Sequence, residues 1–556
     1  MVHLLRWIWR RAPTKLKSHE IHQFNQPSTT HVPGLVLPAT LFISGIVLGE
    51  YSGSPWQPWI VLSILLGTSG CVCRKLGLRG RIAILLGLFV FGAGWSSYHL
   101  KYLSHEDILH ITGSDDPDHR RLVRVEGIIQ NVTHSRAGVH GDLHVSSLVD
   151  PTRGRRPVVG TLFTRLPASC SIVSGERIQC TGWVVPTRIS GNEEDVHWAK
   201  HARYTGRRGY LLIPEPGNIM GLDVSSMKDQ VTLLKGRVQQ ASLERLVDGI
   251  SDDSVRSLLA GLVLGLRLES WKKTAAPFRR IGVAHLLAIS GMHLGIIVAF
   301  AYGSMHLIRG SPGIQAAVSL AFLFIYIFMV EWRAPIQRAS LMLCIYAILW
   351  MARRRCRTTG ILVLTATGSI IHQPGEIFQA GFQLSYLVVF ALASWAGIVQ
   401  KRWSPRLTRT QHPGMKSISW CRSMFAVSVL AWLTATPIVL HHFEIISPLG
   451  PVLSVILFIP TVVIVILGFL RIILFAVIPP LDGGLCFLLE FVASSMITMS
   501  EWADSIPWSS FETGRPPVLI TIMLLAGAAA WARYGVRHLY WSCRQLRQRV
   551  QFIQGP

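Results

Sequence analysis

Long apolar segments separated by short polar ones make up most of the chain, and one extended polar stretch interrupts them. In a bilayer a helix satisfies its own backbone hydrogen bonds, and about 20 apolar residues cross the hydrocarbon. The pattern predicts twelve membrane-spanning helices, at 34–50, 59–73, 81–98, 282–308, 313–330, 335–352, 359–372, 379–399, 423–441, 450–478, 485–500 and 516–533. The segment at 359–372 is short, and 450–478 is either one long tilted span or two broken ones.

Basic residues between the apolar segments predict the orientation of the chain in the membrane. They cluster in the leader at 1–33, at Arg353–Arg357, at 401–422 and at Arg533–Arg549. Because cytoplasmic loops carry an excess of Lys and Arg, we expect both termini, including the basic tail at 534–556, in the cytoplasm. The leader has no apolar core followed by a small-residue cleavage site, which argues against a cleaved signal peptide. Three crossings at 34–98 then place the polar stretch outside the inner (plasma) membrane of a bacterium.

Composition supports a membrane protein and weakens any conclusion from charge. Half of the residues are hydrophobic (50%) and only 15% are charged. The net charge is +24, from 54 basic and 30 acidic residues. In a membrane protein much of this excess belongs to cytoplasmic loops, so charge alone does not indicate nucleic-acid binding.

The polar stretch predicts a small all-β domain at 99–220. Five short segments with alternating or β-branched residues lie at 121–129, 143–146, 158–163, 176–185 and 209–213, separated by Gly, Pro and Ser. Five strands in such a length are typical of a small barrel such as an OB-fold. Barrels of this kind often bind oligonucleotides, but a structural or gating domain is an equal alternative, since fold alone does not give function.

Two of the nine cysteines, Cys170 and Cys180, lie in this β domain. An oxidising exterior would allow them to form a disulfide, with two free thiols as the alternative. No pair of Cys-x-x-Cys motifs is present, and most of the remaining cysteines lie in or beside apolar segments.

The segment after an amphipathic helical connector (221–280) begins the larger membrane domain (281–533) and has unusual polar positions. His285, Ser290, Gly291 and His293 interrupt an otherwise apolar span. One hypothesis is a broken helix whose backbone and histidines line a pore. The other is close helix packing through glycines, with each histidine bonded to a neighbouring carbonyl. A metal site is poorly supported, because the histidines are eight positions apart and no Cys or carboxylate accompanies them.

Further polar and aromatic side chains lie within or beside later spans. Phe378, Phe382, Tyr386 and Phe390 recur every four residues, with Gln379, Gln383 and Ser385 nearby. Bases could stack on such rings, although an aromatic stripe at helical spacing is more often packing. Arg333 and Arg338 flank Pro335 at a predicted outer turn, where they would meet a phosphate backbone or pair with Glu331 and lipid head groups.

Four ordered motifs resemble those of the ComEC family of competence proteins. They are His285-Leu-Leu-Ala-Ile-Ser-Gly-Met-His-Leu-Gly, Arg333-Ala-Pro-Ile-Gln-Arg-Ala-Ser-Leu-Met, Ala380-Gly-Phe-Gln-Leu-Ser-Tyr, and Thr436-Pro with Phe443, Ser447-Pro-Leu-Gly and Phe458-Ile-Pro. Asn192–Arg208 is also similar to the segment that closes the family's exported OB-like domain. The resemblance extends from about residue 34 to 480.

The resemblance implies a channel that passes single-stranded DNA across the inner membrane during natural transformation. Its path would be lined by His285, Ser290, Gly291, His293, Arg333, Arg338, Gln379, Gln383 and Ser385. Expected partners are single-stranded DNA, membrane lipids, a separate cytoplasmic ATP-driven motor, an exported DNA receptor and, as a candidate, further copies of this chain.

Enzyme activity is not expected. Many family members continue into a metallo-β-lactamase-like domain, which needs a His-x-His-x-Asp-His run that this sequence lacks, so we expect a separate nuclease. No nucleotide-binding loop or Ser-His-Asp arrangement is evident either, and neither a cofactor nor a metal is expected. The rival hypotheses are a transporter or scaffold for a lipid or envelope component on the same fold, and an inactive relative.

Overall fold

Each of the twelve apolar segments contains a helix in the computed structural model of the chain. The structure describes residues 33–52, 54–75, 80–102, 106–108, 121–135, 138–150, 154–167, 169–170, 172–186, 193–223, 226–331, 333–351, 358–403, 413–474 and 482–530. Residues 1–32 of the leader, the cluster at Arg353–Arg357 and the tail at 534–556 lie outside this range. Nothing described therefore tests the orientation predicted from those basic residues.

Six helices of the described chain are long and apolar enough to cross a membrane. They are Trp56–Cys73, Arg81–Leu100, Ala380–Gly397, Cys421–Phe443, Gly450–Leu474 and Asp482–Asp504. Four more apolar helices, Leu37–Tyr51, Gly291–Leu307, Ala317–Met329 and Thr358–His372, are shorter. The chain thus has the helices of a membrane protein, and the number of twelve spans stays a prediction.

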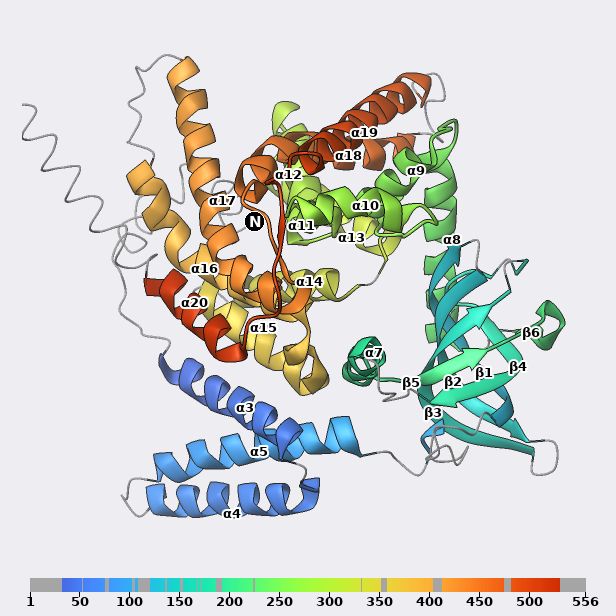
Figure 1. The fold of residues 1–556 in the computed structure, drawn as a ribbon, viewed down its shortest axis with the longest axis vertical. Coiled ribbons are helices and arrows are strands. Elements are labelled where there is room, and N and C mark those ends of the chain that lie inside the picture. The colour runs from blue at the N-terminus through green and yellow to red at the C-terminus, as the bar shows by residue number, and fades with distance from the viewer. Residues whose placement is uncertain are drawn as a thin grey trace, which may run out of the picture. The chain divides into compact units, whose positions relative to one another are not determined.

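The described residues divide into two compact units, each coloured by sequence position in Figure 1. Unit 1 comprises residues up to 248 together with 264–269 and 294–379. Its helices are α3 (Pro33–Tyr51), α4 (Trp56–Lys75), α5 (Arg81–Lys101), α7 (Glu193–Tyr204), α8 (Met227–Val247), α13 (Pro312–Met329), α14 (Ala334–Met351) and α15 (Thr358–His372), with short turns η2 (Pro216–Asn218) and η4 (Pro374–Phe378).

Unit 2 comprises 249–263, 270–293 and the residues from 380 onward. Its elements are α9 (Asp253–Leu259), α10 (Trp271–Arg280), α11 (Ala284–Leu287), α16 (Ala380–Trp403), α17 (Pro413–Phe443), α18 (Gly450–Leu474), α19 (Asp482–Asp504), α20 (Val518–Ala530) and the paired strands β7 (Ile445–Ile446) and β8 (Phe511–Glu512). The π-helix η3 (Ala260–Leu264) and helix α12 (Gly291–Leu307) each have residues in both units.

Glycines allow α5 to pack closely against α3 in the three-helix layer of unit 1 (Figure 1). A Cβ added to Gly49 of α3 would lie 2.8 Å from the Cα of Ala93 on α5. Gly45 and Gly92 face backbone of the opposite helix in the same way. Small residues that let two backbones approach are typical of helix pairs in membranes.

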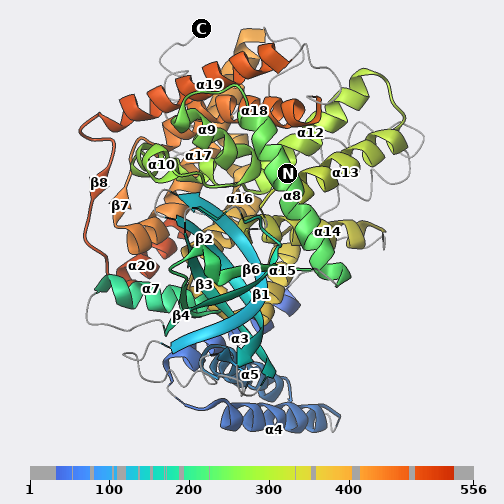
Figure 2. The same cartoon turned by 90° about the vertical axis from the view of Figure 1, so that its right-hand side faces the viewer.

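The β domain is a closed sheet. Its strands are β1 (Arg121–Ser135), β2 (Gly138–Asp150), β3 (Gly154–Leu166), β4 (Arg177–Pro186), β5 (Arg207–Leu212) and β6 (Ile219–Leu222). The strands pair in the order β1, β2, β3, β5 and β4, and β4 also pairs with β1. Five strands therefore form a ring. Figure 2 shows the long curved strands that make this ring. The five predicted strands are confirmed, and β6, which extends the edge of β4, is additional.

Alternation along the strands fills the centre of the barrel. Val125, Ile129, Leu143 and Leu162 are all fully buried. Ile129 lies opposite Leu143, and Leu143 lies opposite Leu162, so successive strands place apolar side chains in register. This cluster gives the β domain a hydrophobic core of its own.

The segment predicted as either one span or two at 450–478 is a single helix, α18, in the described residues. At its end Arg471 is 1% exposed, and its Nε and NH2 groups donate to the two Asp482 oxygens of α19 at 2.7 and 3.0 Å. A buried guanidinium requires such a partner. The pair therefore fixes how α18 and α19 meet.

Candidate functional site

The span predicted at 282–308 is interrupted. Helix α11 ends at Leu287 and α12 begins at Gly291, with Ala288 in an extended conformation (φ −81°, ψ 123°). Ser290 caps the new helix, because its Oγ accepts a hydrogen bond from the Met292 backbone N–H at 3.2 Å. The broken helix predicted at Ser290-Gly291 is thus present in the backbone.

His293 completes this cap from the other direction. The ring Nδ1 of His293 accepts a hydrogen bond from the Ser290 backbone N–H at 3.2 Å, and the backbone N–H of His293 donates to the Ser290 carbonyl at 3.0 Å. With Nδ1 as an acceptor, the neutral ring carries its proton on Nε2. His293 is fully buried, and its Nε2 has no hydrogen-bond partner among the described residues. The arrangement resembles a capping box that leaves one buried N–H donor for another group.

His285 does not join His293. It belongs to the short helix α11 and is exposed, whereas His293 is buried at the start of α12. Among the described residues no cluster of three or more His, Cys, Asp or Glu residues could hold a metal ion. The two histidines therefore have different environments.

The chain before the break is held by the fourth motif. Ser447 donates from its Oγ to the Arg280 carbonyl at 2.5 Å, and Trp432 Nε1 donates to the Ser447 carbonyl at 3.0 Å. Gly282 has a positive φ of 78°, and a Cβ there would lie 2.7 Å from the Ser447 Cβ. Residues far apart in the sequence thus meet in unit 2, and only a glycine fits at 282 without displacement.

Arg280 also has a charged partner on α19. Its Nε lies 2.8 and 3.0 Å from the two carboxylate oxygens of Asp504, and its NH2 group contacts the same carboxylate. Asp504 is 14% exposed at its side chain. A bidentate pair of this kind fixes orientation as well as distance. Sequence patterns did not single out Arg280, Asp504 or Trp432, although an indole within an apolar span is a signal that it has a hydrogen-bond partner.

The third motif lies on α16 in unit 2. The Oε1 of Gln383 and the Nε2 of His442, at the end of α17, are 3.0 Å apart. Phe382 and Tyr386 are buried and their ring centroids are 4.5 Å apart, while Ser385 between them is half-buried. The aromatic rings in the middle of the stripe therefore pack within the protein.

The predicted four-member stripe is wrong at its first member. Phe378 lies in the turn η4 before α16 begins at Ala380, and its ring stacks on Tyr204 at a centroid distance of 4.9 Å. The short helical turn, started by Pro374, breaks the helical spacing between Phe378 and Phe382. Only the residues from Phe382 onward share one helix.

Gln379 has a structural partner in unit 1. Its Nε2 donates to the Tyr204 carbonyl at 3.3 Å, and Gln373 Nε2 donates to the same carbonyl at 2.9 Å. Tyr204 ends helix α7, and its hydroxyl donates to Glu50 of α3 at 3.3 Å. Burial of this hydroxyl raises the pKa of Tyr204. Arg203 also pairs with Glu50, at 2.7 Å. The end of α7 is thus fixed to α3 and η4.

The predicted path arginines lie in unit 1 beside carboxylates. Arg333 is ion-paired with Glu331, as one of the two hypotheses proposed. Arg338 is 4% exposed. Burial raises the pKa of the Glu376 carboxyl, and Arg338 and His372 nearby act in the opposite direction. Both arginines therefore already have an acidic side chain nearby, with which a phosphate group would compete.

The nine predicted path residues are divided between the units. His285, Ser290, Gly291, His293, Gln383 and Ser385 belong to unit 2, and Arg333, Arg338 and Gln379 belong to unit 1. Within unit 2 the structure joins Ser290 and His293 directly. The predicted disulfide is absent, since Cys170 and Cys180 are both free thiols. Cys180 faces the core of the barrel, where burial raises its pKa to about 12.

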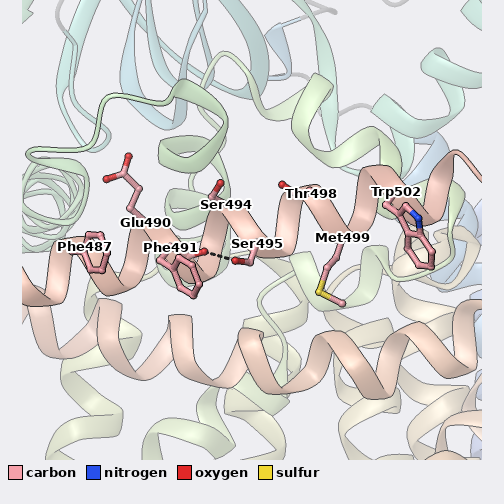
Figure 3. Close-up of a pocket in the computed structure, with 8 residues that line it drawn as sticks. All are labelled: Phe487, Glu490, Phe491, Ser494, Ser495, Thr498, Met499 and Trp502. Atoms are coloured by element: carbon pink, nitrogen blue, oxygen red, sulfur yellow. Dashed lines mark hydrogen bonds between the residues drawn. The ribbon is translucent and has the colours of Figure 1, made fainter.

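A hollow of about 670 Å³ follows one face of α19. Figure 3 shows its eight side chains arranged along that single helix. Phe487 and Trp502 are 72% and 65% exposed. The lining of the hollow combines these rings with four polar side chains from the same helix, Glu490, Ser494, Ser495 and Thr498.

Comparison with known proteins gives a consistent family assignment. The Competence protein family model matches residues 262–537, which include the helix break and all four motifs. The chain is 28% identical to ComE operon protein 3 of Bacillus subtilis over 187 residues (34% of this chain, 22% of the relative). It is 25% identical to competence protein ComA of Neisseria gonorrhoeae over 236 residues (40% and 32%), and 24% identical to recombination protein 2 of Haemophilus influenzae over 238 residues (41% and 28%).

The alignments thus span only 22 to 32% of the length of these relatives. No solved structure matches the chain.

Proposed function

We propose that this chain, which belongs to the ComEC/Rec2 family of competence proteins, is the membrane component through which one strand of DNA crosses the inner membrane during natural transformation. The observation that carries the proposal is the match of the family model to residues 262–537. A relative named for competence and another named for recombination support the same process. The specific channel role rests on the physical features of the matched region.

The helix break supports a path for a polar solute. Non-helical backbone at membrane depth is tolerated where protein buries it or where it lines a water-filled cavity. Here the break carries the buried Nε2–H of His293, a donor with no acceptor among the described residues. A phosphate oxygen or base carbonyl of a passing strand is an acceptor of the kind this donor lacks. Because His293 is fully buried, we propose that the path opens at the helix break for its Nε2–H to contact the strand, with Ser290 and Gly291 shaping the backbone around it.

The β domain completes the proposal on the outer side of the membrane. We propose that its ring of five strands is an OB-like barrel that lies outside the cytoplasm, with both chain termini inside and twelve spans in total. A separate cytoplasmic motor would pull the strand, and an exported receptor and a nuclease would supply it. These partners follow from the proposed transport, which requires work and a single strand.

Uptake of labelled DNA by cells tests the proposal. We expect deletion of the gene to abolish internalised DNA while DNA remains bound at the cell surface. His293→Asn retains an acceptor for the Ser290 N–H but removes the distal donor, whereas His293→Gln retains a distal donor. If the Nε2–H contacts the strand, uptake falls about tenfold or more in the Asn variant and less in the Gln variant, since an unpaired buried acceptor costs roughly 1–3 kcal/mol.

His306→Ala is the matched control, because His306 is an exposed histidine on the same helix α12. All variants are compared at equal membrane levels. Normal uptake in the deletion strain would refute a role in DNA uptake. Equal uptake in the Asn, Gln and control variants would refute the contact assigned to His293.

A further inference from the structure

A second hollow, of about 380 Å³, lies within unit 1 where α5 ends beside the barrel. Its walls come from Tyr98 and Tyr102 at the end of α5, from His144 on β2, from Thr161 on β3 and from Arg208 on β5. A volume in this range accommodates one small organic ligand. None of these residues belongs to the motifs of the matched family region.

The chain between α5 and the barrel fixes one wall of this hollow. The Val159 N–H donates to the Glu106 carbonyl at 2.9 Å, so the segment at 106–108 adds to β3. Ile108 is fully buried in the barrel core and lies against Gly160, where a Cβ would be 2.9 Å from its Cγ2. The wall is therefore held by backbone pairing and by core packing.

Two tyrosines form an aromatic platform on the opposite side. The rings of Tyr98 and Tyr102 are stacked, with centroids 5.3 Å apart and planes 16° apart. Trp56 meets both edge-on, at 5.2 and 6.1 Å, and so fixes their orientation. Each tyrosine is nevertheless 38% exposed. The platform is thus rigid and open to a planar partner.

The remaining wall is polar but has balanced charge. His144 Nδ1 and Thr161 Oγ1 are 3.0 Å apart, which places hydrogen-bonding groups on the barrel side. Arg208 Nε lies 2.7 Å from an Asp107 oxygen, so its positive charge is offset at the pocket. A pocket with aromatic rings, hydrogen-bonding groups and paired charges favours a flat, uncharged heterocycle over a free anion.

We propose that this hollow, the α5–barrel pocket, binds one unpaired base of single-stranded DNA by stacking on Tyr98 and Tyr102. The inference rests on the proposed function for its ligand, and adds a contact for the strand outside the family's matched region. Stacking on aromatic side chains accepts any base, because every base has a π-face. The pocket would hold a base where α5 meets the barrel, while the phosphates remain in solvent.

Fluorescence of a base analogue tests the pocket on the purified full-length protein in lipid nanodiscs. The probe is a short oligo(dT) that carries one 2-aminopurine, whose emission is quenched by stacking. We expect quenching with the wild type and about tenfold weaker binding in the Tyr98→Leu, Tyr102→Leu double variant, since that variant loses the stacked base. The Phe substitutions at both positions should restore it.

Tyr51→Leu is the matched control, because Tyr51 is a 77% exposed tyrosine at the end of α3. An oligonucleotide of the same length in which every position is abasic should bind the wild type about tenfold more weakly, a result that needs no variant. Absent quenching in the wild type, or equal binding by the double variant and the control, would overturn the pocket. A pure lipid-contact role for these tyrosines would give that second result.

Failure of this proposal can be distinguished from failure of DNA uptake. If deletion abolishes internalised DNA but the double tyrosine variant binds and quenches like the wild type, the proposed function stands and the pocket assignment fails. Normal uptake in the deletion strain would remove the proposed function itself.

Discussion

Gly282 offers the most direct test of how the structure holds the helix break. Its φ of 78° lies in a region that costs an alanine roughly 1–2 kcal/mol. Its Cβ would also lie 2.7 Å from the Ser447 Cβ, and overpacking of this kind costs about 1–3 kcal/mol. We therefore expect Gly282→Ala to destabilise unit 2 by roughly 2–5 kcal/mol.

Thermal unfolding of the purified protein in detergent measures this loss. For a cooperative unit of about 150–250 residues, 1 kcal/mol shifts Tm by about 2–4 °C, so the midpoint should fall by roughly 4–20 °C. Gly397→Ala is the control, since Gly397 is exposed on α16 with no atom within 4 Å of an added Cβ. That variant should unfold at the wild-type temperature or slightly above it.

A double variant separates the clash from the backbone strain. Ser447→Gly removes the Cβ that Gly282→Ala would meet, at the cost of the hydrogen bond to the Arg280 carbonyl. We expect the double variant to be less destabilised than the sum of the single variants by about 1–3 kcal/mol. Additive losses, or a Gly282→Ala protein as stable as the control, would refute the packing described for this site.

Two further outcomes follow from buried groups. Arg471→Ala should destabilise unit 2 by about 3–5 kcal/mol, because Asp482 would lose its buried partner. Arg279 is exposed, so Arg279→Ala should have little effect in the same unfolding assay. Equal effects of the two substitutions would contradict the role of the Arg471–Asp482 pair. At mildly alkaline pH Cys180 should resist alkylation in the folded protein, because burial raises its pKa to about 12, while the partly exposed Cys170 reacts. Since only the unfolded chain would lose that thiol proton above the ordinary pKa, stability should fall as pH rises from there towards 12. Mass spectrometry of labelled peptides checks the thiols, and protection of both until reduction would instead reveal a disulfide.

The sequence by itself determined which segments form helices and where the β domain lies. Length and hydropathy suffice for the helices because a helix in lipid must be apolar and satisfy its own backbone. Alternation of β-branched residues likewise gave the five strands, since one face of each strand fills the barrel. Ser290-Gly291 marked the helix break correctly, because serine caps and glycine both act within a few residues.

Only the tertiary structure decided what the polar side chains contact. Glu126 lies in an alternating strand, yet it is fully buried, with Arg155 as an ion-pair partner and hydrogen bonds from Ser147 at 3.0 Å and Gln179 at 3.2 Å. Gln379 donates to the carbonyl of Tyr204, a residue 175 positions away. Local pattern gives the period of an element but not the identity of its neighbours, since hydrogen bonds and ion pairs between distant segments depend on how the whole chain packs.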